Sequence, residues 1–255
     1  MTVLGVASGS GGVGCSSLVA AIGVRAAARD LRVVVVDGNP MRGGLQVSMA
    51  AEHVPGHRWE HLVEVDGAID GTRLIERLPS VEGVAVLSAG RAGIALERVC
   101  PEPLPEGVLD EVLDALVRAV DLVVVDWNGL PRPGLGPCVL IVPADPRGLA
   151  DAEVWLGRCG GEDLAGLLTR GRRTERRIAE AIAQGLGLPL LGEIRDDRQV
   201  LAAQRRGVPP ATGRRGSVRR IADDLVSAVL AASDSLGASD PVERGHGSFG
   251  HRGAP

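Results

Sequence analysis

The chain has 255 residues, of which 45% are hydrophobic and 24% charged, and its formal net charge is −4. This length and hydrophobic content are enough for one large buried core, and the negative charge argues against a protein that binds polyanions over its whole surface. The four cysteines lie far apart and no histidine stands at metal-ligand spacing, which excludes a zinc motif and a disulfide framework and fits a reducing cytoplasm. There is neither a leader nor an apolar run long enough to cross a bilayer, so we expect a soluble protein with at most peripheral membrane contact.

Apolar, β-branched runs bounded by turn residues predict strands along the chain. They cover 2–7, 31–36, 84–87, 122–125, 138–142, 164–168 and 190–194. Segments with helical periodicity lie between most of them, over 16–29, 72–78, 106–119, 149–158, 174–185 and 197–206. Strands that are apolar throughout and alternate with helices predict an α/β fold, with a doubly wound, mostly parallel sheet covered by helices on both faces. Ligands of such sheets bind beyond the carboxyl ends of the strands.

Two later segments depart from this alternation. The connection 128–137 is rich in proline and glycine and too short for an ordinary crossover helix, so we expect a bare loop or a non-standard crossover. An apolar stripe over 218–230 predicts a last helix, which we expect to dock on its own domain because its polar face carries Asp223 and Asp224. Residues 233–255 are rich in glycine, serine and proline and are expected to be a disordered tail behind a domain that spans 1–232.

A glycine-rich loop follows the first predicted strand and precedes the first predicted helix, where a phosphate-binding loop would lie. As Gly9-x-x-x-x-Gly14-Cys15-Ser16 it is a nucleotide-triphosphate loop in which cysteine replaces the phosphate-binding lysine. In that template Ser16 would place its hydroxyl on Mg²⁺, and Asp126, at the end of a later apolar strand, would be the second metal-binding side chain. We expect Cys15 to be a small neutral filler of the lysine position rather than a reactive thiol.

The same loop also fits a second template. As Gly9-x-Gly11-x-x-Gly14 it is a dinucleotide fingerprint, for which Asp37, at the end of the second strand, would hold a ribose hydroxyl. The pattern of the loop alone leaves both templates open.

Every one of the 28 basic residues is arginine, so no lysine elsewhere can replace the missing one. Arg147 and Arg42 are candidates for that charge, although nothing in the sequence places either beside the loop. Other arginines gather in the segments 169–177 and 195–220, where they predict a solvated charged face or a surface that attracts phosphate groups.

Several segments together resemble the MinD/ParA superfamily of deviant Walker A P-loop ATPases, and more closely its actinobacterial CpaE-like branch. They read "SGSGGVGCSS", "VVVVDGNPMRGGLQVSMAAEHVPGHRW", "LPSVEGVAVLS", "DLVVVD" and "LGLPLLGEIRDDRQVLAAQRRGVPP". The resemblance runs from about residue 2 to residue 221. It implies nucleotide-dependent dimers that use ATP or ADP with Mg²⁺ rather than NAD. It also implies a role in septum-site determination or in positioning Flp/Tad pilus and secretion machinery at a pole, septum or membrane.

The resemblance assigns a nucleotide-binding set to this chain. It comprises Gly9, Ser10, Gly11, Gly12, Val13, Gly14, Cys15, Ser16, Ser17, Asp37 and Asp126, with Ser16 and Asp126 also as metal ligands. The family's signature lysine, which crosses to the partner's nucleotide, is Ser10 here, and the loop lysine is Cys15. The D-x-D after the second strand has become Asp37-Gly38-Asn39.

These losses predict a localisation or assembly factor whose ATP hydrolysis is weak or lost, with no catalytic residue assigned. We expect it to act as a homodimer, or as a heterodimer with an active paralogue, in the cytoplasm or peripherally at a membrane, pole or septum. Its arginine-rich surface could also contact DNA or a membrane. The alternatives are a functional ATPase of the same family that uses contacts other than lysine, and a dinucleotide-binding oxidoreductase.

Overall fold

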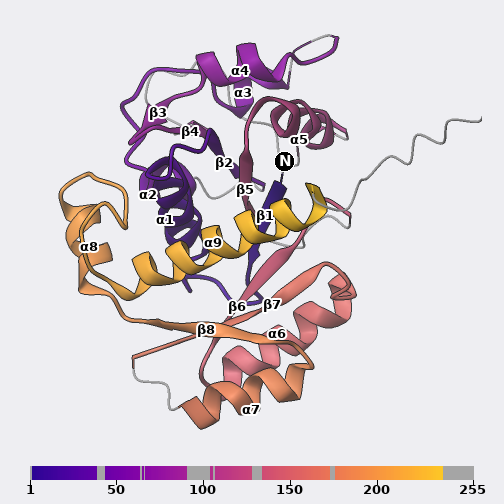
Figure 1. The fold of residues 1–255 in the computed structure, drawn as a ribbon, viewed down its shortest axis with the longest axis vertical. Helices are drawn as coiled ribbons and strands as arrows, with labels where there is room; N and C mark the ends of the chain where they lie inside the picture. Colours follow the sequence, from indigo (N-terminus) through magenta and orange to yellow (C-terminus); the bar gives the residue numbers. More distant parts are fainter. Residues whose placement is uncertain are drawn as a thin grey trace, which may run out of the picture.

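The computed structural model describes residues 2–38, 44–63, 65, 67–90, 104–105, 107–127, 134–172 and 176–237. Within these residues the strands form one sheet of eight, in the order β3-β4-β2-β5-β1-β6-β7-β8 (Figure 1). The strands are β1 Thr2–Ala7, β2 Val33–Asp37, β3 Ser80–Val81, β4 Val84–Leu87, β5 Leu122–Trp127, β6 Cys138–Pro143, β7 Leu164–Gly171 and β8 Leu190–Arg195. All neighbours pair in parallel except β3 with β4, so the predicted mostly parallel sheet is confirmed.

Helices cover both faces of this sheet. They are α1 Cys15–Ala27, α2 Gly44–Ser48, α3 Trp59–Leu62, α4 Gly71–Arg77, α5 Val108–Ala119, α6 Pro146–Cys159, α7 Arg176–Leu186, α8 Arg198–Arg205 and α9 Ser217–Gly237. One apolar core lies between the sheet and α1, α2 and α9, and a second lies between the other face and α3 to α7. Strands β2 and β5 are buried along their whole length, as expected for strands covered on both sides.

The sequence patterns missed the shortest elements, β3, α2 and α3. Strand β3 forms a hairpin with β4 through Glu82 and Gly83, whose φ angles of 53° and 77° are those of a tight hairpin turn. A strand of two residues and helices of four and five residues are too short to show a strand or a helix periodicity.

Strands β5 and β6 flank β1 on opposite sides and run parallel to it, so the connection between them passes across β1. Its residues 128–133 lie outside the described residues, and 134–137 contain no helix. Trp127, the last residue of β5, belongs to the core on the α5 and α6 side. A Cβ on Gly5 would lie 2.6 Å from its Nε1, and one on Gly38 would lie 2.7 Å from its Cε3. The indole of Trp127 therefore lies against these two glycines and covers that part of the sheet face.

The last helix docks on its own domain, as the sequence predicted. Figure 1 shows α9 running in front of the sheet beside α1, and the two helices are in extensive contact. Its apolar stripe joins the core through Val218, Ile221, Ala222, Val226 and Val229. The helix continues to Gly237, past the boundary expected at 232, and the rest of the expected tail, 238–255, lies outside the described residues.

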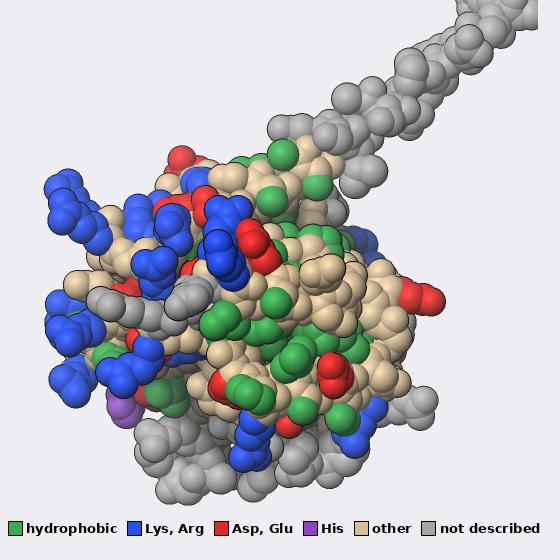
Figure 2. Space-filling model, turned by 90° about the horizontal axis from the view of Figure 1, so that it is seen from below, with side chains coloured by type: hydrophobic (Ala, Val, Ile, Leu, Met, Phe, Trp, Pro, Cys, Tyr) green, Lys and Arg blue, Asp and Glu red, His purple; other side chains and the backbone are tan. Residues whose placement is uncertain are grey.

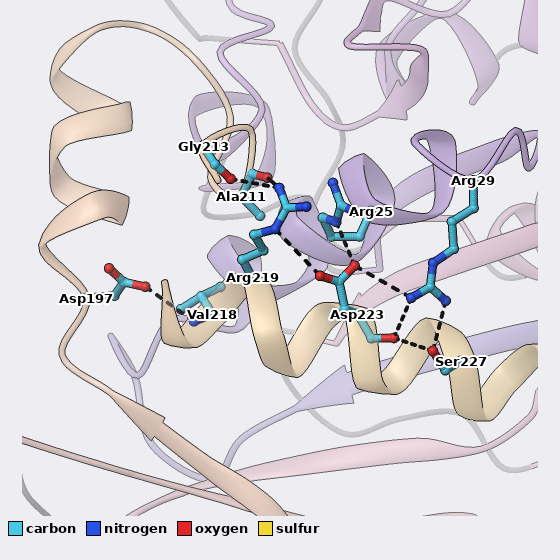
Figure 3. Close-up of polar contacts among 9 residues, drawn as sticks. All are labelled: Arg25, Arg29, Asp197, Ala211, Gly213, Val218, Arg219, Asp223 and Ser227. Carbon is cyan, nitrogen blue, oxygen red and sulfur yellow. Dashed lines mark hydrogen bonds and ion pairs between the residues drawn. The ribbon is translucent and has the colours of Figure 1, made fainter. Parts of the chain in front are cut away.

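Asp223 fixes the polar side of α9 to α1 (Figure 3). Its Oδ1 accepts a hydrogen bond of 2.7 Å from Nε of Arg25 and lies 3.6 Å from Nη2 of Arg29, while its Oδ2 lies 3.6 Å from Nε of Arg219. Arg29 also donates to the backbone carbonyl of Asp223 and to the hydroxyl of Ser227. The side chains of the closest pair, Arg25 and Asp223, are only 15% and 27% exposed, so solvent screens this cluster less than a surface pair.

The substitution Asp223→Asn is expected to destabilise the chain by about 1–3 kcal/mol, because it removes one negative charge and leaves three arginines facing one another. Urea denaturation followed by circular dichroism measures the change. Asp224→Asn is the matched control, since it removes the same charge from an exposed position one residue away. Equal stability of the two variants would contradict a docking role for Asp223.

Candidate nucleotide site

The loop between β1 and α1 forms one side of a cavity of about 450 Å³ at the carboxyl edge of the sheet. All nine loop positions selected from the sequence line this cavity, namely Gly9, Ser10, Gly11, Gly12, Val13, Gly14, Cys15, Ser16 and Ser17. Ser8, Gly44, Ser48, Trp127 and Trp155 complete its lining among the described residues. The cavity thus lies where ligands of parallel sheets bind.

The backbone of the loop is shaped as an anion cradle. Gly12 and Gly14 have φ angles of 76° and 96°, in the left-handed region that side chains disfavour. Gly14 is the N-cap of α1, no side chain caps the helix, and its first turn carries no acidic residue. The first N–H groups of α1 and the positive end of its dipole are therefore not neutralised by a side chain at the cavity.

Three separate elements hold the loop in this conformation. The hydroxyl of Ser8 donates to the carbonyl of Ile141 in β6 at 2.8 Å and accepts from the backbone N–H of Ser10. The hydroxyl of Ser10 donates to Oδ2 of Asp151 in α6 at 2.9 Å. The carbonyl of Val13 accepts a hydrogen bond of 2.9 Å from Nη1 of Arg170 in β7. These anchors from β6, α6 and β7 hold the loop in its conformation without a ligand.

Ser10 and Cys15, which stand at the two positions where the sequence resemblance predicts lysine, are neutral, and both side chains have partners within the chain. Ser10 is bonded to Asp151, as described above. Cys15 packs into the apolar core beneath the loop, and burial, together with the nearby Asp126, raises the pKa of its thiol far above the ordinary range. The thiol therefore stays protonated, as expected for a small filler.

Asp37 is the last residue of β2 and Asp126 the penultimate residue of β5. The two residues pair in register and are both fully buried. Burial raises the pKa of Asp126 to about 6, and the hydroxyl of Ser16 opposes this shift by lowering it. Among the described residues, neither carboxylate oxygen of Asp126 has a partner with hydrogen-bond geometry. A buried carboxylate with unsatisfied oxygens beside a loop hydroxyl is a donor set that Mg²⁺ and its waters would satisfy. Ser16 and Asp126 thus fit the metal-binding role predicted for them.

The strand order bears on the dinucleotide alternative. In dinucleotide-binding folds the second strand lies beside the first, which brings its terminal acidic residue to the ribose. Here β5 lies between β1 and β2, so Asp126 rather than Asp37 ends the strand adjacent to the loop strand. The dinucleotide interpretation is therefore not favoured.

Among the described residues, an arginine that the sequence did not suggest contacts the loop. Arg147 is 92% exposed and lies 3.9 Å from Asp151, and Arg42 lies outside the described residues. Arg170 contacts the loop directly through Val13. No local pattern could have revealed it, because Val13 and Arg170 are 157 positions apart.

A glycine loop between a strand and a helix, with a buried aspartate at the end of the adjacent parallel strand, defines the class of P-loop nucleotide-binding folds. No protein-family model matches the chain. Three solved structures have a similar fold. A MinD cell division protein of Aquifex aeolicus has a TM-score of 0.69 at 15% identity, over 91% of this chain and 97% of that one. A ParA family ATPase of Chlorobium tepidum has a TM-score of 0.69 at 16% sequence identity, over 89% of this chain and 98% of that one. The septum site-determining protein MinD of Pyrococcus horikoshii, complexed with Mg-ADP, has a TM-score of 0.68 at 17% sequence identity. The similarity covers 91% of this chain and 97% of that one.

These similarities show that the chain has the MinD/ParA P-loop ATPase fold. Among curated proteins, an uncharacterised protein of Mycobacterium tuberculosis is 30% identical over 204 residues, which are 76% of this chain and 54% of that protein. The chain thus spans about half the length of this relative. The chloroplastic septum site-determining MinD homologue of Arabidopsis thaliana is 23% identical over 96% of this chain and 80% of its own length. Among the described residues, no helix has the length and apolar character of a membrane span.

The substitution Asp126→Asn is expected to stabilise the metal-free chain at neutral pH. The pKa of Asp126 is about 6 in the folded chain against 3.8 for an unperturbed aspartate, so the folded state holds its proton more tightly. Stability from this group is therefore present below about pH 4, falls as the pH rises towards 6 and stays low above it. Two pKa units correspond to at most about 3 kcal/mol.

Urea denaturation in EDTA at pH 4 and pH 7.5 measures this effect. The stability advantage of Asp126→Asn over the native chain should be present at pH 7.5 and shrink towards pH 4. A variant that is less stable than the native chain at pH 7.5 would show that Asp126 has a stabilising partner.

Proposed function

We propose that the chain is a MinD/ParA-type localisation or assembly factor that binds ATP or ADP with Mg²⁺ at the loop 8–17 and hydrolyses ATP weakly or not at all. One observation carries the proposal, and it concerns the loop and the side chains around it. The glycine cradle, Ser16 and the buried Asp126 are kept, whereas both lysine positions hold neutral side chains that are bonded or packed inside the chain. The site can thus hold an anion and a metal while lacking the charges that act on the transferred phosphoryl group.

The loss of the two lysines is expected to reduce the rate of hydrolysis far more than the affinity for the nucleotide. A charge-assisted contact is typically worth about 1.5–3 kcal/mol, so losing one weakens affinity by about ten- to a hundredfold without abolishing it. A cation inserted onto the transferring phosphoryl group is worth about 10³–10⁵ in rate. Replacing both lysines therefore removes most of the turnover and leaves much of the binding. This balance favours a nucleotide-binding assembly factor over an ATPase that uses other contacts.

The cellular role belongs to the same proposal. The resemblance to the CpaE-like branch points to septum-site or Flp/Tad pilus and secretion positioning, and the Arabidopsis relative is named for septum-site determination. A neutral Ser10 removes the charge that would reach a partner's nucleotide, so we place the chain in a dimer whose other member carries the complete site. An active paralogue is the partner that fits this asymmetry.

A basic surface accompanies the site. The exposed arginines lie in β8, in α8, in the segment between α8 and α9, and in the first turn of α9. They are Arg195, Arg198, Arg205, Arg206, Arg214, Arg215 and Arg220. Figure 2 shows basic side chains gathered on one side of this view of the molecule. Such a cluster attracts phosphate groups, and it supports peripheral contact with DNA or an anionic membrane as part of the proposed role.

Calorimetric titration of ATP and ADP, with and without Mg²⁺, tests the proposal together with a steady-state hydrolysis assay. We expect Mg²⁺-dependent binding of both nucleotides and turnover near the uncatalysed background. Trp127 and Trp155 line the cavity, so binding should also change the intrinsic fluorescence. Asp126→Asn is the matched control, because it keeps the cradle and should remove the dependence on Mg²⁺.

Two results would count against this function. Tight, Mg²⁺-dependent binding with sustained turnover would show a working ATPase. A saturable response to NADH that Asp37→Ala abolishes would instead support the dinucleotide alternative.

A further inference from the structure

Arg170 reaches the phosphate loop from a distant strand. It is the penultimate residue of β7, which is separated from the loop strand β1 by β6. Its Nη1 donates to the carbonyl of Val13 at 2.9 Å, and a Cβ added to Gly14 would lie 2.6 Å from the same nitrogen. The guanidinium therefore lies directly against the two loop residues that precede Cys15, and Gly14 leaves the space it occupies.

The other end of the guanidinium is held loosely. Its Nη2 lies 3.4 Å from Oδ1 of Asp196, whose side chain is 55% exposed, while the side chain of Arg170 is 31% exposed. An exposed ion pair of this length contributes little to stability. The planar fork of donors can thus keep its contact with Val13 while Nη2 exchanges Asp196 for a phosphate oxygen.

Two other groups of described arginines have partners or positions away from the loop. Arg25 and Arg29, at the C-terminal end of α1, are bonded to Asp223, and Arg147 extends from α6 with 92% of its side chain exposed.

From this geometry we infer that Arg170 supplies, from β7, the positive charge that the loop itself has lost, and that it contacts the phosphates of a nucleotide bound there. The inference rests on the proposed function, which supplies the ligand class, a nucleoside di- or triphosphate. Because arginine presents several donors in a plane, it would hold two phosphate oxygens where a lysine places a single point charge.

The competing role for Arg170 is a purely structural one, in which its hydrogen bond to Val13 shapes the loop. Arg170→Gln separates the two roles, since glutamine keeps a hydrogen-bond donor and loses the charge. Arg170→Lys keeps the charge with a different geometry. Cys15→Lys places a cation at the usual loop position. It should therefore restore binding to Arg170→Gln if Arg170 contributes its charge, and not if Arg170 only shapes the loop. Arg147→Gln is the matched control for removal of an exposed arginine near the loop.

The experiment is calorimetric titration of the full chain and these variants with Mg-ATP and Mg-ADP, at two salt concentrations. Thermal midpoints confirm that each variant is folded. We expect Arg170→Gln to weaken binding by about ten- to a hundredfold and to reduce its salt dependence. Arg170→Lys should bind within a few-fold of the native chain, and Arg147→Gln should be unchanged. The double variant Arg170→Gln/Cys15→Lys should recover most of the lost affinity, whereas Cys15→Lys alone should gain little.

Three results would overturn the inference. If the native chain binds and Arg170→Gln binds equally well, Arg170 is not a phosphate contact and only this inference fails. If Arg170→Gln loses affinity that Cys15→Lys does not restore, Arg170 acts by shaping the loop. If the native chain binds neither nucleotide, the proposed function fails and this inference fails with it.

Discussion

The parallel pairing of β5 with both β1 and β2 is the constraint on which the rest of the structure depends. The pairing places Asp126 opposite Val6 on one side and Asp37 on the other. One carboxylate thereby comes to lie under the loop that follows β1, beside the first turn of α1. The apolar strands around it keep out the water that would otherwise solvate this charge, which is why its pKa is raised. The same pairing separates β2 from β1 and makes this a P-loop sheet.

The loop 8–17 presents backbone N–H groups and the positive end of the α1 dipole to the cavity, and its own side chains are all uncharged. Backbone N–H groups, the first turn of α1 and the hydroxyl of Ser16 line the cavity, and Ser10 and Cys15 stand where the sequence resemblance predicts lysine. The side chain of Cys15 packs into the core beneath the loop, and the hydroxyl of Ser10 is hydrogen-bonded to Asp151 in α6. Among the described residues, the arginine that is hydrogen-bonded to the loop is Arg170 of β7.

The main features of the fold and the position of the site follow from the sequence, and the contacts that complete the site do not. Valine-rich strands such as 33–36 and 122–125 carry so clear an apolar signal that the sheet and most of its helices were predictable. Short elements such as α2 and α3 form only because the surrounding core shapes them. The bonds of Ser10 to Asp151 and of Val13 to Arg170 join residues 141 and 157 positions apart. Strand order decides such contacts, and no local pattern encodes strand order.

The clamp of Asp223 on Arg25 and Arg29 joins the first helix of the chain to the last. During synthesis, α1 leaves the ribosome long before α9 exists, so the apolar face that the two helices share stays open to water until α9 has been made. Such late closure lengthens the time in which a nascent chain can associate wrongly. The order of translation therefore decides when α1, which follows the glycine loop, gains the packing of α9 against it.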